Sequence, residues 1–370
     1  MTPALNLAEM PDAAVASRLG RLRPLLAGSG CDALLVTKLE NVRYLTGFSG
    51  SSAMLLVTAK GALLTTDGRY QEQSAEQLAA AGVEAEITIG RPEVQLDALE
   101  RFAADAPRLG LEAASLSWAQ QRRLAERLSA ELVPTSGLVE QLRLVKDEGE
   151  LARIEAACDI ADAALAHVKE RLAEEPTESE FAAELEFEMR RRGAQGPAFE
   201  TIVAAGPNSA MPHHRPSDRR VVERELVVVD FGATFDGYRS DMTRTFVVGR
   251  PDSELVDLLD AVLTSQRAGV RALGPGVPSA AIDEACRSSL TEAGYGAAFL
   301  HSTGHGVGLE IHEAPAVAQG AADILAAGSV VTVEPGAYLA GKGGVRIEDS
   351  LVITDDGARV LTKSTKDHLL

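Results

Sequence analysis

The sequence predicts an α+β protein with two domains, residues 1–137 and residues 138–370. The N-terminal third alternates short apolar runs with helical patterns, which is typical of a smaller α/β domain. The C-terminal two-thirds contains a helix-then-hairpin unit twice, and such a repeat predicts a sheet with pseudo-twofold symmetry. With 370 residues, 45% of them hydrophobic, the chain has enough apolar side chains to build both cores.

The composition excludes some classes of partner and indicates a compartment. Acidic residues outnumber basic ones by 54 to 36, a net charge of −18 that argues against binding nucleic acid or an anionic membrane. Three widely separated cysteines, Cys31, Cys158 and Cys286, are typical of buried thiols in a reducing compartment. The first residues resemble no export signal, and no apolar run approaches the length of a membrane span. We therefore expect a cytoplasmic protein.

The N-terminal third is predicted from its spacing and its turn residues. Helical spacing covers residues 14–29, 71–81 and 117–130, and the runs CDALLVT, AMLLVTA and GALLTTD are expected to form buried strands. The segment NVRYLTGFSG at 41–50, rich in glycine and aromatic residues, is expected to be a loop with a packing role. The breaker PTSG at 134–137 precedes a long amphipathic helix that begins near Lys146, so we place the domain boundary at about residue 137.

The first hairpin of the repeat spans residues 225–248, after a helix that Thr177 and Glu180 open as a capping box. Asp236 and Gly237 suit a tight turn with positive φ angles. With that two-residue loop, Asp241 lies opposite Gly232, and Asp230 lies two residues further along the same face. The two carboxylates are then roughly 7–8 Å apart at the backbone, and they repel each other unless a cation lies between them.

The second unit begins with a helix at Ser279 and ends in a hairpin that also carries two acids, Glu334 and Glu348. Both acids face the same side only if the loop has three residues or the ladder contains a bulge. Gly341, Gly343 and Gly344 permit either arrangement. The two hairpins together predict four carboxylates that converge near the centre of the sheet.

A metal centre follows from this convergence, because four neighbouring carboxylates need divalent cations to compensate their charge. Histidines in the segment HSTGHGVGLEIHEAP offer a nitrogen ligand, and the glycines beside His305 make it the best placed. Such a mixed oxygen and nitrogen set suits a pair of ions, Mn²⁺ first, with Co²⁺ or Zn²⁺ as alternatives, and a hydroxide bridging the pair as the nucleophile.

The motifs that carry these residues resemble those of the pita-bread metallopeptidases, the fold of methionine aminopeptidase, aminopeptidase P, prolidase and creatinase. The resemblance extends through GPNSAMPHH at 206–214, VEPG at 333–336 and GVRIEDS at 344–350. NVRYLTGFSG and TTDGRY resemble the N-terminal domain of the aminopeptidase P and prolidase branch. The resemblance implies a creatinase-like N-terminal domain, a pita-bread catalytic domain and metal ligands at Asp230, Asp241, His305, Glu334 and Glu348.

Roles for single residues also come from the resemblance. Asp241 and Glu348 are expected to bridge both ions, Asp230 to bind one ion, and His305 with Glu334 to bind the other. Glu334 is also expected to guide the water and move its proton.

Three further residues are expected to take part in catalysis. His213 matches a histidine that stabilises the tetrahedral intermediate or the leaving nitrogen, and His312 is expected to contact the scissile carbonyl. Arg346 is expected to orient a ligand carboxylate. Two histidines remain without an assigned role, His214 and His301.

The complete ligand set favours catalysis over a peptide-binding protein without activity. Prolidases commonly place an arginine directly after the HExP segment, where it grips the substrate carboxylate, but HEAP is followed here by Ala316. We therefore expect an Xaa-Pro aminopeptidase of the aminopeptidase P type, with an Xaa-Pro dipeptidase (prolidase) as the alternative. The resemblance also implies a homodimer that acts on short proline-containing peptides. The physiological metal and the residue preferred before proline stay open.

Overall fold

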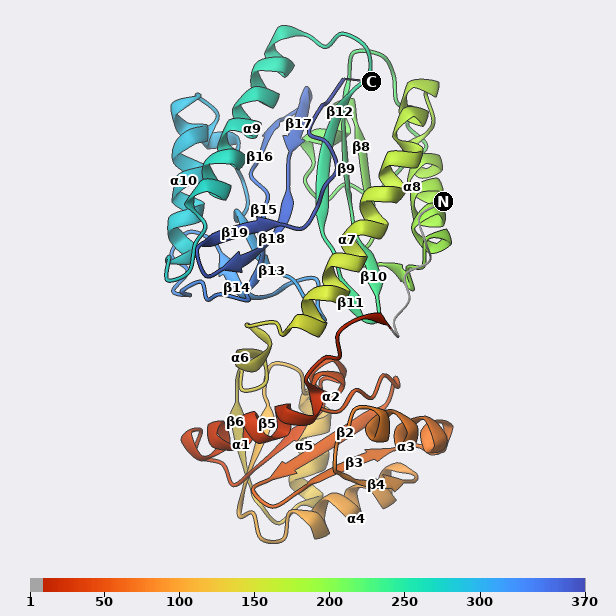
Figure 1. Ribbon diagram of the computed structural model, residues 1–370, viewed down its shortest axis with the longest axis vertical. Helices are drawn as coiled ribbons and strands as arrows, with labels where there is room; N and C mark the ends of the chain where they lie inside the picture. Colours follow the sequence, from red (N-terminus) through yellow and green to blue (C-terminus); the bar gives the residue numbers. More distant parts are fainter. Residues whose placement is uncertain (1–8, 370) are drawn as a thin grey trace. The chain divides into compact units, whose positions relative to one another are not determined.

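The computed structural model describes residues 9–369. The chain forms two compact units, residues 13–143 and residues 144–369 together with 9–12 (Figure 1). The division falls between Arg143 and Leu144, whereas the domain limits 1–137 and 138–370 stay a prediction. Among residues 9–369, no helix has the length and apolar character that a membrane span requires.

The N-terminal unit is built on one six-stranded sheet, in the order β4-β3-β2-β1-β5-β6. β1, β2 and β3 pair antiparallel, and β4, β5 and β6 join them through parallel pairs. The strands are β1 (Ala33–Val36), β2 (Ala53–Thr58), β3 (Ala62–Thr66), β4 (Glu86–Ile89), β5 (Arg108–Glu112) and β6 (Glu131–Thr135). The helices are α1 (Arg18–Gly28), α2 (Leu39–Thr46), α3 (Gln71–Ala80), α4 (Pro92–Phe102), α5 (Trp118–Arg127) and α6 (Glu140–Arg143).

The prediction of a loop at 41–50 is wrong for its first half, because residues 39–46 form helix α2. Val42 and Leu45 lie three residues apart and are both fully buried, so the segment has a helical apolar face that its glycines and aromatic residues obscure. The helix ends at Gly47, whose φ of 76° suits a left-handed C-terminal cap. Tertiary burial therefore decides the structure of this segment.

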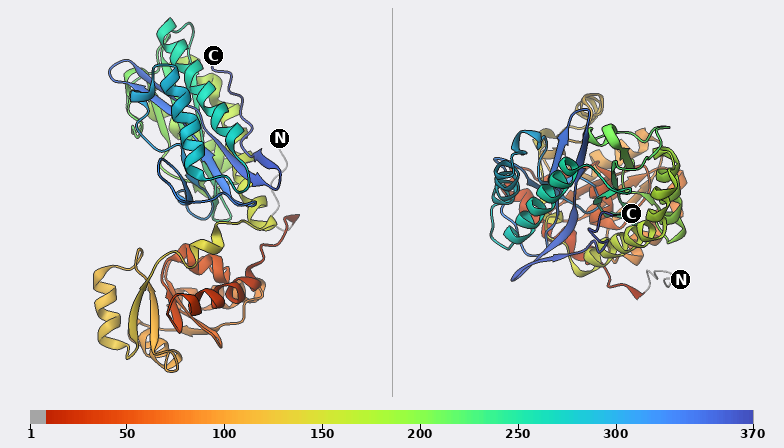
Figure 2. Two further views of the ribbon diagram at one scale, coloured as in Figure 1. Left: turned by 90° about the vertical axis from the view of Figure 1, so that its left-hand side faces the viewer. Right: turned by 90° about the horizontal axis from the view of Figure 1, so that it is seen from above.

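The C-terminal unit contains the predicted repeat of a helix followed by a hairpin, and in each half a further helix precedes it. Its first half comprises α7 (Glu148–Val168), α8 (Glu178–Arg191), β7 (Gly196–Pro197), β8 (Ile202–Ala205), β9 (Leu226–Phe231), β10 (Ala233–Phe235), β11 (Tyr238–Arg239) and β12 (Met242–Val247). Its second half comprises α9 (Ser253–Ala272), α10 (Ser279–Glu292), β13 (Gly304–Gly306), β14 (Glu313–Val317), β15 (Val330–Val333), β16 (Gly336–Leu339), β17 (Gly343–Arg346), β18 (Asp349–Thr354) and β19 (Gly357–Val360). Within this unit, α7 and α8 lie on one side of the strands and α9 and α10 on the other (Figures 1 and 2).

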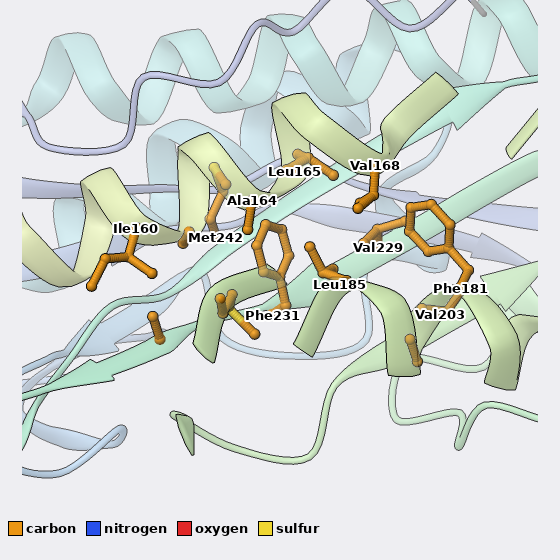
Figure 3. Close-up of a cluster of buried hydrophobic side chains, with 14 of the residues drawn as sticks. Ile160, Ala164, Leu165, Val168, Phe181, Leu185, Val203, Val229, Phe231 and Met242 are labelled. Atoms are coloured by element: carbon orange, nitrogen blue, oxygen red, sulfur yellow. The ribbon is translucent and has the colours of Figure 1, made fainter. Parts of the chain in front are cut away.

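The core of the first half lies between α7, α8 and the strands that carry the predicted aspartates (Figure 3). Leu165 of α7 and Leu185 of α8 meet Val229, Phe231 and Met242 there, and all five are buried. Each such side chain contributes roughly 1.5–3 kcal/mol through burial. This packing fixes β9 and β12, and with them the positions of the acids on those strands.

Both hairpins have the predicted registers. Thr243 of β12 pairs with Asp230 of β9, as the two-residue loop requires, and the loop residues Asp236 and Gly237 have φ angles of 43° and 73°. In the second hairpin Leu339 pairs with Gly343, so residues 340–342 form the three-residue loop. The loop, and not a bulge, therefore places Glu334 and Glu348 on one side.

Candidate active site

All eight residues predicted to form the site line one cavity of the C-terminal unit, with a volume of about 680 Å³. The acids lie on or beside the central strands, and the histidines come from three separate loops or strands. The eight residues are His213, Asp230, Asp241, His305, His312, Glu334, Arg346 and Glu348.

Three of the predicted metal ligands form a tight group. One ligand atom from each of Asp241, His305 and Glu348 lies within 4.8 Å of the other two. His305 Nε2 is also 3.2 Å from Glu334 Oε1 and 3.5 Å from Asp241 Oδ2. Thr243 Oγ1 donates to Glu348 Oε2 at 2.7 Å and fixes that carboxylate. The arrangement brings acids from both hairpins to one point.

The electrostatics of this group fit divalent cations. Asp230 Oδ1 and Glu348 Oε1 are buried and have no hydrogen-bond partner among residues 9–369. Burial and the neighbouring carboxylates raise the pKa of Asp241 and of Glu348 well above their usual values. A cation would supply the missing partner for both oxygens and would stabilise their charged forms. The donor set of four carboxylates and one imidazole suits a first-row divalent ion.

His305 reaches the carboxylates because its two neighbours are glycines. A Cβ atom on Gly304 would lie 2.1 Å from Thr332 O, and one on Gly306 would lie 2.2 Å from Ala314 O. Neither position can accept a side chain without moving backbone. The rings of His305 and His312 meet edge to face, with their centroids 4.4 Å apart.

Arg346 is buried, and all three of its guanidinium nitrogens donate to neighbouring protein oxygens. Its Nη2 donates to Asp230 Oδ2 at 2.6 Å, and its Nη1 donates to the hydroxyl of Tyr338 at 2.8 Å and to Pro212 O at 3.2 Å. Its Nε donates to Thr243 Oγ1 at 3.2 Å. The contact with Asp230 suits the role predicted for Arg346, and each of its three guanidinium nitrogens is already bonded to a protein oxygen.

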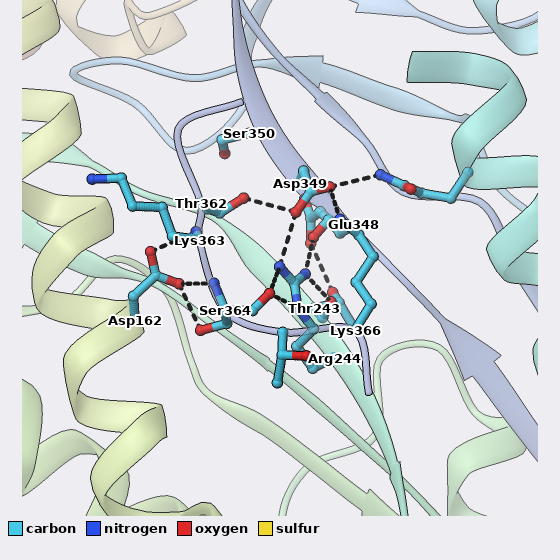
Figure 4. Close-up of polar contacts among 12 residues, drawn as sticks. Asp162, Thr243, Arg244, Glu348, Asp349, Ser350, Thr362, Lys363, Ser364 and Lys366 are labelled. Atoms are coloured by element: carbon cyan, nitrogen blue, oxygen red, sulfur yellow. Dashed lines mark hydrogen bonds and ion pairs between the residues drawn. The ribbon is translucent and has the colours of Figure 1, made fainter. Parts of the chain in front are cut away.

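A second buried arginine holds the backbone at Glu348, just before β18 (Figure 4). Arg244 donates to the main-chain oxygen of Glu348, to Asp349 Oδ1 at 2.9 Å and to Ser364 O at 2.8 Å. Lys366 Nζ lies 2.6 Å from Asp349 Oδ2. This network joins the C-terminal segment to the back of the site, and the sequence analysis missed it because the spacing of these residues follows no recognisable pattern.

The sequence analysis also missed a carboxylate that organises the loop around His213. Glu178, the first residue of α8, is fully buried. Its Oε1 accepts hydrogen bonds from Ala205 N at 2.7 Å and from Asn208 Nδ2 at 3.0 Å. Its Oε2 accepts from Ser217 N at 3.0 Å and contacts His214 Nε2 at 2.8 Å. In sequence Glu178 reads as an ordinary first-turn acid, since only the tertiary fold buries it.

A buried ion pair supports His312 in a similar way. Lys146 Nζ lies 2.7 Å from Glu313 Oε1, and the two side chains are only 1% and 5% exposed. Glu313 directly follows His312 and is the first residue of β14. The ion pair therefore fixes the backbone next to His312. The sequence analysis used Lys146 only to mark a helix start.

Comparisons with known proteins agree with this architecture. The model of "Metallopeptidase family M24" matches residues 152–355, more than half of the chain, and the "Creatinase/Prolidase N-terminal domain" matches residues 18–145. An Xaa-Pro dipeptidase of Pyrococcus furiosus is 36% identical over 355 residues, which cover 95% of this chain and 99% of that protein.

Two solved structures are similar over nearly the whole chain. An Xaa-Pro dipeptidase from Bacillus anthracis has a TM-score of 0.93 at 39% identity, with 96% of this chain and 100% of that chain covered. An X-Pro aminopeptidase from Thermotoga maritima has a TM-score of 0.85 at 35% identity, with 95% and 100% covered. Family models, relatives and structures thus agree, and the chain belongs to metallopeptidase family M24, with the pita-bread fold and a creatinase/prolidase N-terminal domain.

Proposed function

We propose that the chain is an Xaa-Pro dipeptidase, which hydrolyses the bond between a first residue and a C-terminal proline. The observation that carries the hydrolytic activity is the group formed by Asp241, His305 and Glu348 inside a cavity of substrate size. The names of the Pyrococcus furiosus and Bacillus anthracis proteins favour the dipeptide as substrate. They support the alternative of the sequence analysis better than its first expectation, an Xaa-Pro aminopeptidase.

The metal ligands are part of this proposal. We infer that two divalent ions, Mn²⁺ first and Co²⁺ or Zn²⁺ otherwise, are held by Asp230, Asp241, His305, Glu334 and Glu348. When bound, the ions supply Lewis-acid polarisation of the scissile carbonyl and lower the pKa of the water nucleophile.

The chain's own residues move the protons. Burial opposes ionisation of Glu334, but its hydrogen bond with His305 prevails and lowers the pKa of Glu334. Glu334 is therefore a carboxylate at neutral pH and accepts the proton of the attacking water. His213 and His312 line the cavity and donate to the oxyanion or to the departing proline nitrogen. That nitrogen needs a proton because it takes the electron pair of the broken C–N bond and leaves as a neutral amine.

The cavity also fits the proline ring. Phe199, Ile202 and Ile311 line it and offer apolar surface beside the polar centre. A pyrrolidine ring has no N–H to satisfy, so an apolar wall binds it without loss of a hydrogen bond.

The second candidate function, an Xaa-Pro aminopeptidase, is favoured by one observation. Ala316 lines the cavity with only a methyl group where a prolidase commonly has an arginine. Mass-spectrometric analysis of products from Ala-Pro, Ala-Pro-Ala and Ala-Ala-Ala with each metal distinguishes the two. The dipeptidase is expected to cleave Ala-Pro and to leave Ala-Pro-Ala largely intact, whereas the reverse pattern would refute it.

We also propose a cytoplasmic homodimer. Cys31, Cys158 and Cys286 are buried free thiols, which suits a reducing compartment. Light scattering behind size-exclusion chromatography measures the mass, and twice the 39.0 kDa of one chain is expected.

A further inference from the structure

A dipeptide substrate ends in a carboxylate attached to the proline itself, so a dipeptidase needs a cation near its proline pocket. Among the described residues, the cavity is lined by two arginines, Arg215 and Arg346, and by no lysine. Arg346 is 4% exposed at its side chain and all its nitrogen atoms donate to protein oxygens. Arg215 is therefore the guanidinium that a substrate can reach.

Arg215 has a weakly held partner. Its Nη2 lies 3.2 Å from Glu200 Oε2, and the two side chains are 81% and 63% exposed. An ion pair this exposed contributes only about 0–1 kcal/mol, so the guanidinium can exchange it for another carboxylate at little cost. Glu200 follows Phe199, which lines the same cavity, and this places the pair beside the apolar wall.

The backbone on both sides of Arg215 is held by hydrogen bonds, although its side chain is exposed. Glu178 contacts Nε2 of His214, the residue before Arg215, at 2.8 Å. It also accepts a hydrogen bond at 3.0 Å from the N–H of Ser217, two residues after Arg215. A backbone held by hydrogen bonds with an exposed guanidinium suits a group that must meet a ligand at one defined place. Arg215 also lies two residues from His213, which we place at the scissile bond.

We propose that Arg215 binds the C-terminal carboxylate of the Xaa-Pro dipeptide, exchanging its contact with Glu200 for the substrate. The proposal rests on the dipeptidase function above and names the residue that gives it specificity for a free carboxylate. Arg215 thus takes the task that Ala316 cannot perform. Glu200 holds the guanidinium at the rim until a dipeptide replaces it.

Steady-state kinetics with Ala-Pro and Ala-Pro-amide test this assignment, because the amide lacks the negative charge. Arg215→Ala is expected to raise KM for Ala-Pro about 10- to 100-fold, as loss of a charge-assisted pair predicts. KM for Ala-Pro-amide is expected to stay within about twofold of the wild-type value. Arg215→Lys is expected to restore part of the affinity, since lysine keeps the charge but not the fork. Glu200→Gln is expected to lower KM for Ala-Pro, because the competing carboxylate is gone.

Arg224→Ala is the matched control. Arg224 is also an exposed arginine, 62% at its side chain, and it pairs with Asp252 outside the cavity. Its loss is therefore expected to leave KM unchanged for both Ala-Pro and Ala-Pro-amide. An Arg215→Ala enzyme with wild-type KM for Ala-Pro would overturn the assignment while the dipeptidase function stands. A wild-type enzyme that leaves Ala-Pro intact overturns the proposed function, and this inference with it, before any variant is made.

Discussion

Replacement of Glu178 by glutamine tests how the fold holds the loop that carries His213. One oxygen of Glu178 accepts from Ala205 N and from Asn208 Nδ2, and the other accepts from Ser217 N and Ser217 Oγ and contacts His214. Glutamine has nearly the same shape but only one acceptor oxygen. If that oxygen keeps its hydrogen bond from Ala205 N–H, the new NH₂ group faces the N–H of Ser217. Two donors then point at each other, and neither has an acceptor.

The magnitude follows from those contacts. A buried N–H left unsatisfied costs about 1–3 kcal/mol, and exchanging a charged acceptor for a neutral one costs about 1 kcal/mol more. We expect Glu178→Gln to lower the free energy of unfolding by about 2–4 kcal/mol. Because the loop carries His213, kcat is expected to fall as well, by about tenfold.

Two assays measure the effect. Urea unfolding followed by circular dichroism gives the free energy, and hydrogen–deuterium exchange of residues 205–217 reports the loop itself. Glu170→Gln is the control, since this side chain is 72% exposed and its loss is expected to cost less than about 0.5 kcal/mol. A Glu178→Gln protein as stable as the control, with unchanged exchange in the loop, would refute the reasoning.

Further predictions concern charges near the site. Burial opposes ionisation of Glu178, but hydrogen bonds led by Ala205 N–H lower its pKa, so its stabilisation is present above about pH 4.5 and is lost as the pH falls. The difference in unfolding free energy between wild type and Glu178→Gln should therefore shrink in urea titrations between about pH 5 and pH 3; a constant difference would contradict this. Lys146→Met removes the buried cation beside Glu313 and is expected to cost about 3–5 kcal/mol in the same titration, and a loss below about 1 kcal/mol would argue against the pair. Arg244→Met is expected to expose residues 362–369 to proteolysis, followed by mass spectrometry, and an equally resistant tail would show that other contacts hold it.

The sequence was sufficient to predict the features that depend on local pattern. The turn at Asp236 and Gly237 set the register of the first hairpin, and of the two arrangements left open for the second hairpin, a three-residue loop or a bulge, the loop is the one observed. Once both registers are known, the convergence of the acids follows from alternation along the strands. The site residues therefore lie in one cavity as expected.

Features that depend on tertiary burial could not be predicted. Helix α2 lies in a segment whose glycines and aromatic residues obscure the helical spacing of its buried residues. Glu178, Arg244 and Lys146 are charged residues that a sequence places on the surface, yet each is buried against a partner distant in the chain. Such pairs share no spacing rule, so their roles emerge only from the assembled structure.

Titration of metal-free protein with Mn²⁺ tests the central claim most directly, with calorimetry and Ala-Pro hydrolysis measured on the same samples. The account predicts two ions per chain and activity that rises with occupancy. Asp241→Asn is expected to lose both metal binding and activity, because Asp241 is one of the three grouped ligands. Protein that binds no Mn²⁺, Co²⁺ or Zn²⁺, or that cleaves Ala-Pro equally well without metal, would contradict it.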